Sequence, residues 1–376
     1  MKIKNIVIFY PSFEAGGVEK IIENLIIFFT RKGLKVYLIS TKTKNLNILK
    51  KIKNLNILTT KNQSLNVLPN RFSSSINCIG ILKNILNKLN RQNTVVHSMQ
   101  SNFIPIIISK LKGFKIVIRN SENPISSIKF AENKISSYFI FFLRFIFYNL
   151  SDKIITNSKD SSLSLKYFLF GFNKRKVNYI YNPYLTQKKI VSSYKKVKKK
   201  NIILSVGRLT KQKNFEDLIY AFKNFQTKHE NYILNIIGKG YQMDYLKNII
   251  KSENLTKSVF LKGYIKNLDY EYKISKLFVL PSIYEGLGNV LIEALNFSVP
   301  CVSTNCKSGP SEILSYGKGG LIVPIKDQVS LEKGMSKLID NYSLALKKLN
   351  YGKKKLFRFN CNKQSMKYLK TLDSVL

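Results

Sequence analysis

The sequence is poor in the side chains that form disulfides or hold structural metals. Its 376 residues include two histidines and four cysteines, Cys78, Cys301, Cys306 and Cys361. No two cysteines have the spacing of a redox motif, and no histidine lies near them at the spacing of a zinc site. This pattern favours a reduced, cytoplasmic compartment over a secreted, disulfide-bonded one.

Long apolar runs are also lacking. The longest, Tyr138–Leu150, spans 13 residues and includes Arg144, whereas a membrane-spanning helix needs about 20. The first run, Ile6–Tyr10, is too short for the core of a signal peptide and fits a buried strand. We therefore predict no transmembrane segment and a cytoplasmic protein. Residues 137–150 have two interpretations: a buried core helix, or an interfacial element at the inner face of the cytoplasmic membrane.

Acidic residues are scarce. The chain has 21 Asp and Glu against 63 Lys and Arg, a net charge of +42. The net charge is +24 over residues 1–190 and +18 over residues 191–376. Two explanations of this charge compete. Only 8 of the 63 basic residues are Arg, as AT-rich coding would produce. Alternatively, the protein has a cationic surface that attracts the phosphates of lipids or nucleic acids. The lysines are scattered and no nucleic-acid-binding motif occurs, so a basic nucleic-acid-binding protein is only a remote alternative.

Short apolar strands alternate with helical stretches in both halves of the chain. The first half predicts strands at 6–10, 35–40, 94–99, 114–120 and 152–158. The second half predicts strands at 201–207, 231–238, 258–264, 277–282, 300–304 and 320–324. Such alternation is typical of parallel βαβ units, so we predict an α/β protein with two Rossmann-like, doubly wound domains.

A lysine-rich, non-periodic stretch after Pro183 separates the halves. We predict an N-terminal domain over 1–186, a basic linker over 187–200, a C-terminal domain over 201–345 and a helical segment over 346–376 that could pack back on the N-terminal domain. Ligands of such sheets bind at the carboxyl ends of the strands, so we expect the two domains to face each other across a ligand-binding cleft.

The most informative segment is LFVLPSIYEGLGNVLIEAL, residues 277–295. A buried strand leads into a loop that contains Glu285, and a helix follows that carries Glu293. Glycines let the backbone approach a ligand closely, and free amides at the start of the helix bind anions such as a diphosphate. The carboxylates can accept hydrogen bonds from sugar and ribose hydroxyls. The candidate donor-binding residues here are Gly288, Asn289, Val290, Leu291 and Glu293.

This segment resembles the Glu-x7-Glu signature of glycosyltransferase family 4, the group 1 glycosyl transferases, which are retaining enzymes of the GT-B fold. Glu285 and Glu293 match the two glutamates. Residues 205–222, SVGRLTKQKNFEDLIYAF, are similar to the segment in which the family's phosphate-binding Arg and Lys fall on Arg208 and Lys213. A pair of cations suits a diphosphate leaving group, whose charge must be neutralised as the glycosidic bond breaks. The resemblance implies that Arg208, Lys213 and Glu285 are catalytic.

Further matches extend the resemblance over nearly the whole chain, although it is sharp only in residues 205–324. Gly238 lies in the family's G-x-G turn, while Gly263 and Tyr264 fall where the family usually contacts the nucleobase. In the first half, Gly16 and Gly17 fit a Gly-Gly turn close to the donor phosphates and sugar. Residues 306–314 and 319–324 are similar to two further family segments.

One feature of the family is missing. Many members carry a His in the loop after the strand that ends here at Arg119, and this chain has Asn120 at that point. Asn120 is therefore a candidate site residue in place of that His. His97 is the other N-domain candidate, although a lone His after a strand is more often structural.

The resemblance implies a nucleoside-diphosphate-sugar donor, most often UDP-linked, and an acceptor that binds the N-terminal domain. The acceptor would be a saccharide or a lipid-linked saccharide of bacterial surface polysaccharide, lipopolysaccharide or glycan biosynthesis. No cofactor and no metal are expected, because no Asp-x-Asp motif follows a predicted strand, and the cations and the helix dipole would take the metal's part. A sugar-nucleotide epimerase of the same fold is the alternative.

Overall fold

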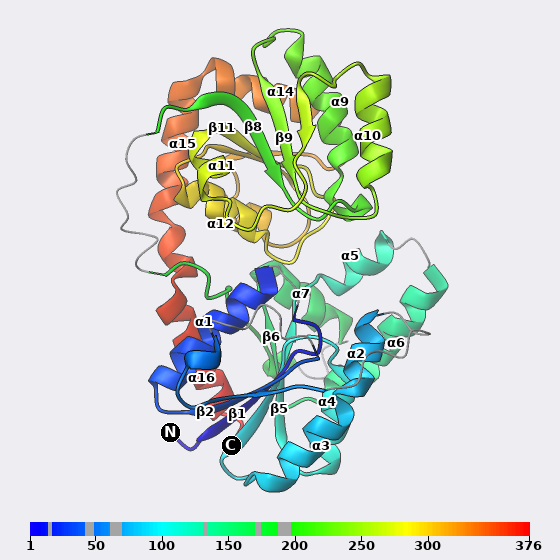
Figure 1. Ribbon diagram of the computed structural model, residues 1–376, viewed down its shortest axis with the longest axis vertical. Coiled ribbons are helices and arrows are strands. Elements are labelled where there is room, and N and C mark those ends of the chain that lie inside the picture. The colour runs from blue at the N-terminus through cyan, green and yellow to red at the C-terminus, as the bar shows by residue number, and fades with distance from the viewer. Residues whose placement is uncertain (14–16, 42–48, 61–69, 131–133, 170–173, 187–196) are drawn as a thin grey trace. The chain divides into compact units, whose positions relative to one another are not determined.

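The computed structural model describes residues 1–13, 17–41, 49–60, 70–130, 134–169, 174–186 and 197–376. The chain divides into two compact units (Figure 1). The first contains Met1–Thr186 together with Phe359–Leu376, and the second contains Gln187–Arg358. Each unit is an α/β domain built on a parallel sheet, as the alternating pattern predicted.

In the described part of the first unit, a seven-stranded sheet has the order β3-β2-β1-β4-β5-β6-β7, and all paired neighbours are parallel. The strands are β1 (Asn5–Phe9), β2 (Lys35–Ile39), β3 (Leu55–Leu58), β4 (Thr94–Ser98), β5 (Lys115–Asn120), β6 (Lys153–Thr156) and β7 (Val177–Tyr179). Its helices are α1 (Gly17–Arg31), α2 (Asn70–Asn77), α3 (Ile79–Lys88), α4 (Phe103–Leu111), α5 (Pro124–Lys129), α6 (Lys134–Leu150), α7 (Lys159–Phe168) and α16 (Cys361–Asp373). Two short 3₁₀ turns are η1 (Leu49–Lys51) and η2 (Lys174–Lys176).

Both faces of this sheet are covered, which explains why its strands read as continuous apolar runs rather than as alternating ones. Successive side chains point to opposite faces. Val7 and Val96 belong to the core cluster that also contains residues of α3, α4 and α7. His97, one position along β4, lies on the other face, where its ring packs edge-on against Tyr368 of α16.

The second unit contains, within its described residues, a six-stranded parallel sheet with the order β10-β9-β8-β11-β12-β13. The strands are β8 (Lys200–Val206), β9 (Ile233–Ile237), β10 (Val259–Leu261), β11 (Ser275–Leu280), β12 (Cys301–Thr304) and β13 (Leu321–Val323). The helices are α9 (Phe215–Gln226), α10 (Met243–Ser252), α11 (Asp269–Ile274), α12 (Asn289–Asn296), α13 (Pro310–Ile313), α14 (Gln328–Asp340) and α15 (Tyr342–Lys354). The 3₁₀ turns are η3 (Lys211–Lys213) and η4 (Leu356–Phe359).

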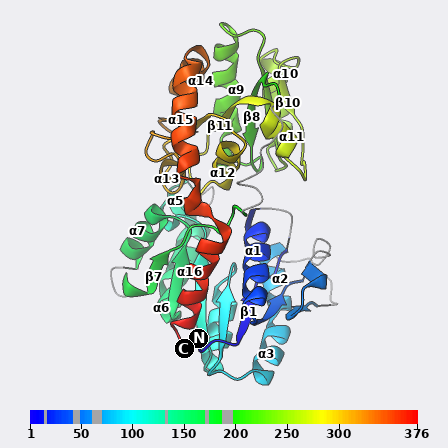
Figure 2. The same ribbon diagram turned by 90° about the vertical axis from the view of Figure 1, so that its left-hand side faces the viewer.

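The end of the chain returns to the first unit. Helix α16 packs against α1, and the amides of Lys2 and Ile3 donate to the Asp373 carboxylate at 2.8 and 2.9 Å. Figure 2 shows α16 alongside α1, with the two chain ends next to each other. Helix α15 lies in the second unit, beyond the boundary that we placed at residue 345. Of the stretch interpreted as a linker, residues 187–196 lie outside the described residues, and Lys200 is already the first residue of β8.

Candidate active site

The second sheet reverses its strand order between β8 and β11. The chain runs outward from β8 through β9 to β10 and then crosses to β11 on the other side of β8. In open α/β sheets, ligands bind at such a switch point, outside the carboxyl ends of the strands. The loops after β8 and β11 are the two that carry Arg208, Lys213 and Glu285.

Glycines allow the loops after β8 and β9 to touch backbone to backbone. A Cβ atom on Gly238 would lie 1.8 Å from the carbonyl oxygen of Gly207, and one on Gly240 would lie 2.0 Å from that of Leu209. The amide of Gly238 donates to the carbonyl of Gly263, in the loop after β10, at 2.8 Å. The family-like G-x-G turn therefore fixes the loop that carries Arg208, and no larger residue fits at either glycine.

The loops after β8, β11 and β12 are joined in the same way. Gln212 donates from its side chain to the carbonyl of Tyr284 at 2.8 Å, and its own carbonyl accepts from the amide of Ile283 at 2.9 Å. A Cβ atom on Gly309 would lie 2.3 Å from the Cα atom of Leu287. Segments that lie far apart in the sequence thus form one closely packed platform at the switch point.

Lys213 and Glu285 form an ion pair on this platform. The stem of Lys213 crosses Gly207, and a Cβ atom added to that glycine would lie 3.3 Å from it. The same carboxylate oxygen of Glu285 accepts a hydrogen bond from Ser282 at 2.8 Å. The side chains of Lys213 and Glu285 are 12% and 8% exposed, so the pair is largely shielded from water. Burial, and secondarily the Glu285 charge, raise the pKa of the nearby Cys306 thiol, which is therefore unreactive.

Arg208 lies in the same loop with its side chain exposed. That side chain makes no hydrogen bond or ion pair with any residue that the structure describes. Glu293 is half-buried in α12, and its carboxylate accepts a hydrogen bond from the hydroxyl of Tyr272 at 3.0 Å. The Tyr272 ring is fully buried and stacks on Phe297 at 5.5 Å, so the position of its hydroxyl is fixed.

Helix α12 begins at Asn289, after Gly288 with a φ of 85°, a left-handed conformation that favours glycine. One of the amides predicted to be free is not: the amide of Leu291 donates to the carbonyl of Gly288 at 3.0 Å. This correction arises because the first turn closes tightly, with an acceptor three residues back. Tyr264, after β10, is 49% exposed.

The candidates in the first unit lie in different settings. Gly16 lies outside the described residues, and Gly17 is the exposed first residue of α1. Asn120 ends β5 with its side chain buried, donating to the main chain two residues further on at 2.6 Å. His97 is fully buried in the core next to Tyr368, and burial lowers the pKa of its imidazole to about 4. This location is that of a core histidine, the interpretation that the sequence already favoured.

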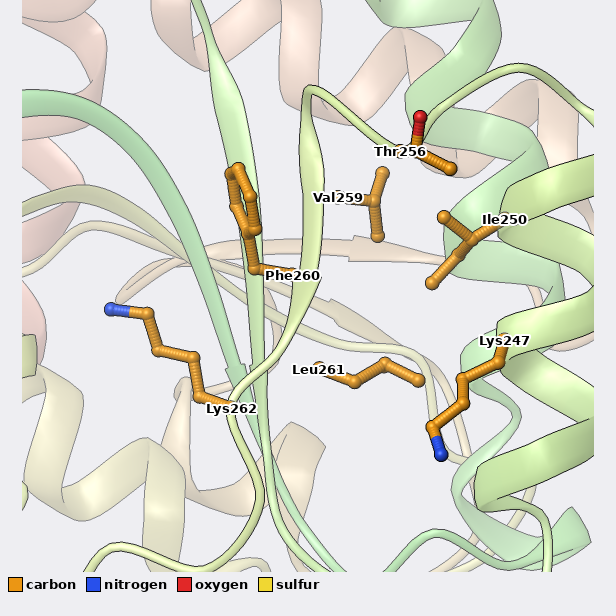
Figure 3. A pocket seen from close by; sticks show the side chains of 7 residues that line it. All are labelled: Lys247, Ile250, Thr256, Val259, Phe260, Leu261 and Lys262. Carbon is orange, nitrogen blue, oxygen red and sulfur yellow. The ribbon is translucent and has the colours of Figure 1, made fainter.

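A separate depression of about 500 Å³ lies at the edge of the second sheet, beside α10 and β10. Figure 3 shows Val259 and Leu261 on the side of Ile250 and α10, with Phe260 and Lys262 on the opposite side of the strand. Side chains that point apart do not converge on a ligand, so we place the active site at the switch point. Among the described residues, no three His, Cys, Asp or Glu side chains cluster as a metal site would require.

Three supporting residues escaped the sequence analysis: Gln212, Tyr272 and Ser282. Ser282 stands within the segment already singled out, and its place three residues before Glu285 was the available signal. Gln212 and Tyr272 carry no such signal, because their partners lie 72 and 21 residues away in sequence.

Comparisons with known proteins find relatives among the glycosyltransferases. The sequence model of the family "Glycosyl transferases group 1" matches residues 186–355. An N-acetylgalactosamine-N,N'-diacetylbacillosaminyl-diphospho-undecaprenol 4-alpha-N-acetylgalactosaminyltransferase of Campylobacter jejuni is 31% identical over 276 residues, 71% of this chain and 73% of that protein. An uncharacterized glycosyltransferase of Methanocaldococcus jannaschii is 32% identical over 258 residues, 61% of this chain and 62% of that protein. The crystal structure of Anabaena HepE in complex with UDP and glucose matches with a TM-score of 0.79 at 15% identity, covering 99% of this chain and 100% of that one.

Proposed function

The chain belongs to the group 1 glycosyltransferases, and on that premise we propose that it transfers a sugar from a nucleoside-diphosphate sugar to a saccharide or lipid-linked acceptor. The observation that carries this proposal is the shielded Lys213–Glu285 pair, with the exposed Arg208 in the same loop as Lys213, at the switch point of the sheet. We further propose that the donor is UDP-linked and that the anomeric configuration is retained.

In this proposal the diphosphate binds between Arg208, Lys213 and the first turn of α12. Arg208 is exposed and can turn toward an anion, and its guanidinium suits the geometry of a phosphate. Lys213 has three N–H donors, so it can keep Glu285 while it donates to the diphosphate. The positive end of the α12 dipole adds to the same field.

The two glutamates hold the sugars. Glu285 sits in the loop before α12 and accepts from hydroxyls of the transferred sugar with the lone pairs that Lys213 and Ser282 leave unused. Glu293 chelates the ribose diol, and the hydrogen bond from Tyr272 orients its carboxylate for that contact. Carboxylates fixed by buried neighbours lose little freedom when the donor binds.

In this proposal, neutralisation of the charge on the departing diphosphate contributes most to catalysis. As the glycosidic bond breaks, negative charge grows on the departing diphosphate, and in this proposal Arg208, Lys213 and the helix end neutralise it. We propose no covalent nucleophile. The acceptor hydroxyl attacks from the side of the leaving group, and the departing phosphate takes its proton. These cations do the work that a metal ion does in other transferases, so we propose metal-independent transfer without a cofactor.

The acceptor is proposed from the relatives. The Campylobacter jejuni relative is named for an undecaprenol-diphosphate-linked acceptor. We infer that the present protein also extends a lipid-linked saccharide of a bacterial glycan, at the cytoplasmic side of the membrane.

The experiment has two steps. Thermal-shift measurements with UDP-, GDP- and ADP-sugars identify the donor, and transfer to a polyprenyl-diphosphate saccharide is then measured for the wild type, Arg208→Ala and Lys247→Ala. Lys247 is an exposed cation on α10 whose recorded ion pair is with Asp244, so it controls for the loss of a surface charge. We expect Arg208→Ala to lose transfer by at least about a hundredfold and Lys247→Ala to retain it. Wild-type transfer by folded Arg208→Ala, or release of an epimerised donor in place of a glycosylated acceptor, would contradict the proposal.

A further inference from the structure

Helix α6 is apolar nearly all round, but the described residues pack against only one of its faces. The rings of Phe141 and Phe145 lie 4.2 and 6.2 Å from that of Phe168 in α7. Phe147 contacts Phe103 of α4, and Tyr148 is the buried residue of the helix. This face therefore belongs to the core of the first unit.

The opposite face carries a stripe of exposed apolar side chains, which we call the α6 stripe. It consists of Ile135, Tyr138, Phe139, Phe142, Ile146 and Leu150. Apart from the adjacent Tyr138 and Phe139, these residues recur every three or four positions, so they line one side of the helix. Ile135 is 84% exposed, Phe139 63% and Phe142 59%. The interpretation of this segment as a buried core helix is thus correct for one face only. Large contiguous apolar surface of this kind marks an interaction site.

The helices that contact α6 also expose apolar side chains. Helix α4 contacts α6 and leaves Ile107 and Leu111 exposed, and α7 leaves Leu163 and Tyr167 exposed. No described helix of the chain is long and apolar enough to span a membrane. A largely apolar helix of 17 residues with one exposed face can instead lie in the plane of the bilayer interface.

Charge determines which partner fits. Helix α6 has no Asp or Glu and begins at exposed Lys134, while its Arg144 is paired with Glu122 at 3.8 Å. Residues 103–168, from α4 to α7, contain ten Lys and Arg against four Asp and Glu. A second copy of this chain would bring the same excess of positive charge, which opposes association through this face. An anionic lipid surface offers both complementary charge and an apolar layer for aromatic side chains.

We propose that the α6 stripe inserts into the interface of an anionic lipid bilayer and holds the first unit there as a peripheral membrane protein. The inference deepens the proposed function and rests on it for its purpose, since a lipid-linked acceptor would be presented at that surface. Docking itself is measured without donor or acceptor, so the two ideas can fail separately.

The absence of tryptophan from the chain allows a direct test. In full-length protein, Phe139→Trp places a single indole in the stripe, and Phe357→Trp places one at a 54% exposed position of the second unit. Both are mixed with vesicles of phosphatidylglycerol and phosphatidylcholine, with and without bromolipid. We expect a blue shift and bromolipid quenching for Phe139→Trp and neither for Phe357→Trp. Unchanged emission of Phe139→Trp at low salt overturns the proposal.

Co-sedimentation supplies the second measurement. Wild type should pellet with these vesicles at about 0.05 M NaCl, less at about 0.5 M, and little with pure phosphatidylcholine. Phe139→Ser/Phe142→Ser should lower the partition coefficient at least about tenfold, and the control Tyr270→Ser/Phe357→Ser should leave it unchanged. Equal binding by the stripe variant, or a wild-type dimer that the variant abolishes without vesicle binding, overturns the assignment.

Two activity measurements separate this inference from the proposed function. UDP-sugar binding and transfer to a short water-soluble acceptor should be the same in wild type and in the stripe variant. Vesicle binding by a protein that transfers no sugar would remove the proposed function and keep the docking surface. Sugar transfer by a protein that binds no vesicles would keep the proposed function and remove the docking surface.

Discussion

The Lys213–Glu285 pair offers the sharpest test of the active-site platform. Because the two side chains are 12% and 8% exposed, removing one charge leaves the other shielded from water without a partner. Glu285→Gln keeps the size of the side chain and its hydrogen bond from Ser282, and Lys213→Met keeps the stem that crosses Gly207. Each substitution therefore isolates the charge.

The magnitude follows from the shielding. Two charges about 3 Å apart attract by about 5 kcal/mol at an effective dielectric constant near 20, and desolvation of both ions offsets much of this. Removal of one partner from a buried pair costs about 3–5 kcal/mol, because the remaining ion keeps its desolvation cost without its partner. The double substitution removes both ions, so it should cost much less than the sum of the two, with a coupling of about 2–3 kcal/mol.

The assay is urea unfolding followed by far-UV circular dichroism, with hydrogen exchange to assign the transition to the second unit. Lys223–Glu253 is the matched control, an ion pair of 2.6 Å whose side chains are 49% and 24% exposed. Its coupling should stay below about 1 kcal/mol, the usual value for exposed pairs. If the free energies of Lys213→Met and Glu285→Gln add to within about 0.5 kcal/mol, the pair is not coupled in solution and our account of the platform is wrong.

Three further predictions concern other parts of the two units. Gly238→Ala should destabilise the second unit by more than about 3 kcal/mol in urea unfolding, because the new Cβ would lie 1.8 Å from a carbonyl oxygen. Gly263→Ala is the control, since its Cβ would meet open space. It should cost only about 1–2 kcal/mol of backbone strain in the same assay. Tyr272→Phe should raise the KM for the donor about tenfold with kcat little changed, because it removes the hydrogen bond that orients Glu293. If steady-state kinetics show an unchanged KM, Tyr272 does not orient Glu293 for the donor. His97 is neutral in the folded state because burial lowers its pKa from 6.5 to about 4, so the unfolded chain binds the extra proton and stability falls as the pH drops from 6.5 toward 4. Between pH 7 and 5 this amounts to about 2 kcal/mol, and the loss should be absent from His97→Gln in parallel urea titrations.

The strands of the second unit were predictable from the sequence because they are buried on both faces and separated by clear helical stretches. All six predicted strands of that unit overlap β8 to β13. In the first unit the sequence pattern does not predict β3 and β7, the two edge strands, which are only four and three residues long. Edge strands bury less surface, so β3 has none of its side chains fully buried and gives no apolar run to detect.

The sequence contains less evidence that α16 returns to the first unit. The segment reads as helical and basic, and nothing local shows which unit its apolar side chains cover. That is decided by contacts such as the packing of Tyr368 on His97, 271 positions earlier, and by the Asp373 carboxylate at the amides of Lys2 and Ile3. For helix α6 the difficulty was different. A helix that is apolar nearly all round reads as buried, and only the tertiary structure shows that no described element covers one of its faces.

For the candidate site, the sequence indicated which residues belong to it but not which of them contact each other. Motif spacing indicated Lys213 and Glu285 with separate roles, one for phosphate and one for sugar, but it could not reveal that they are paired before any donor arrives. The pairing depends on Gly207, which leaves room for the stem of Lys213, and on Gly238 and Gly240, which bring together backbones that side chains would hold apart. The carboxylate thus neutralises the lysine and fixes it over the loop. Under the function that we propose, a diphosphate meets an ammonium that is already placed, so the cost of ordering and desolvating that cation is met largely during folding rather than during the reaction.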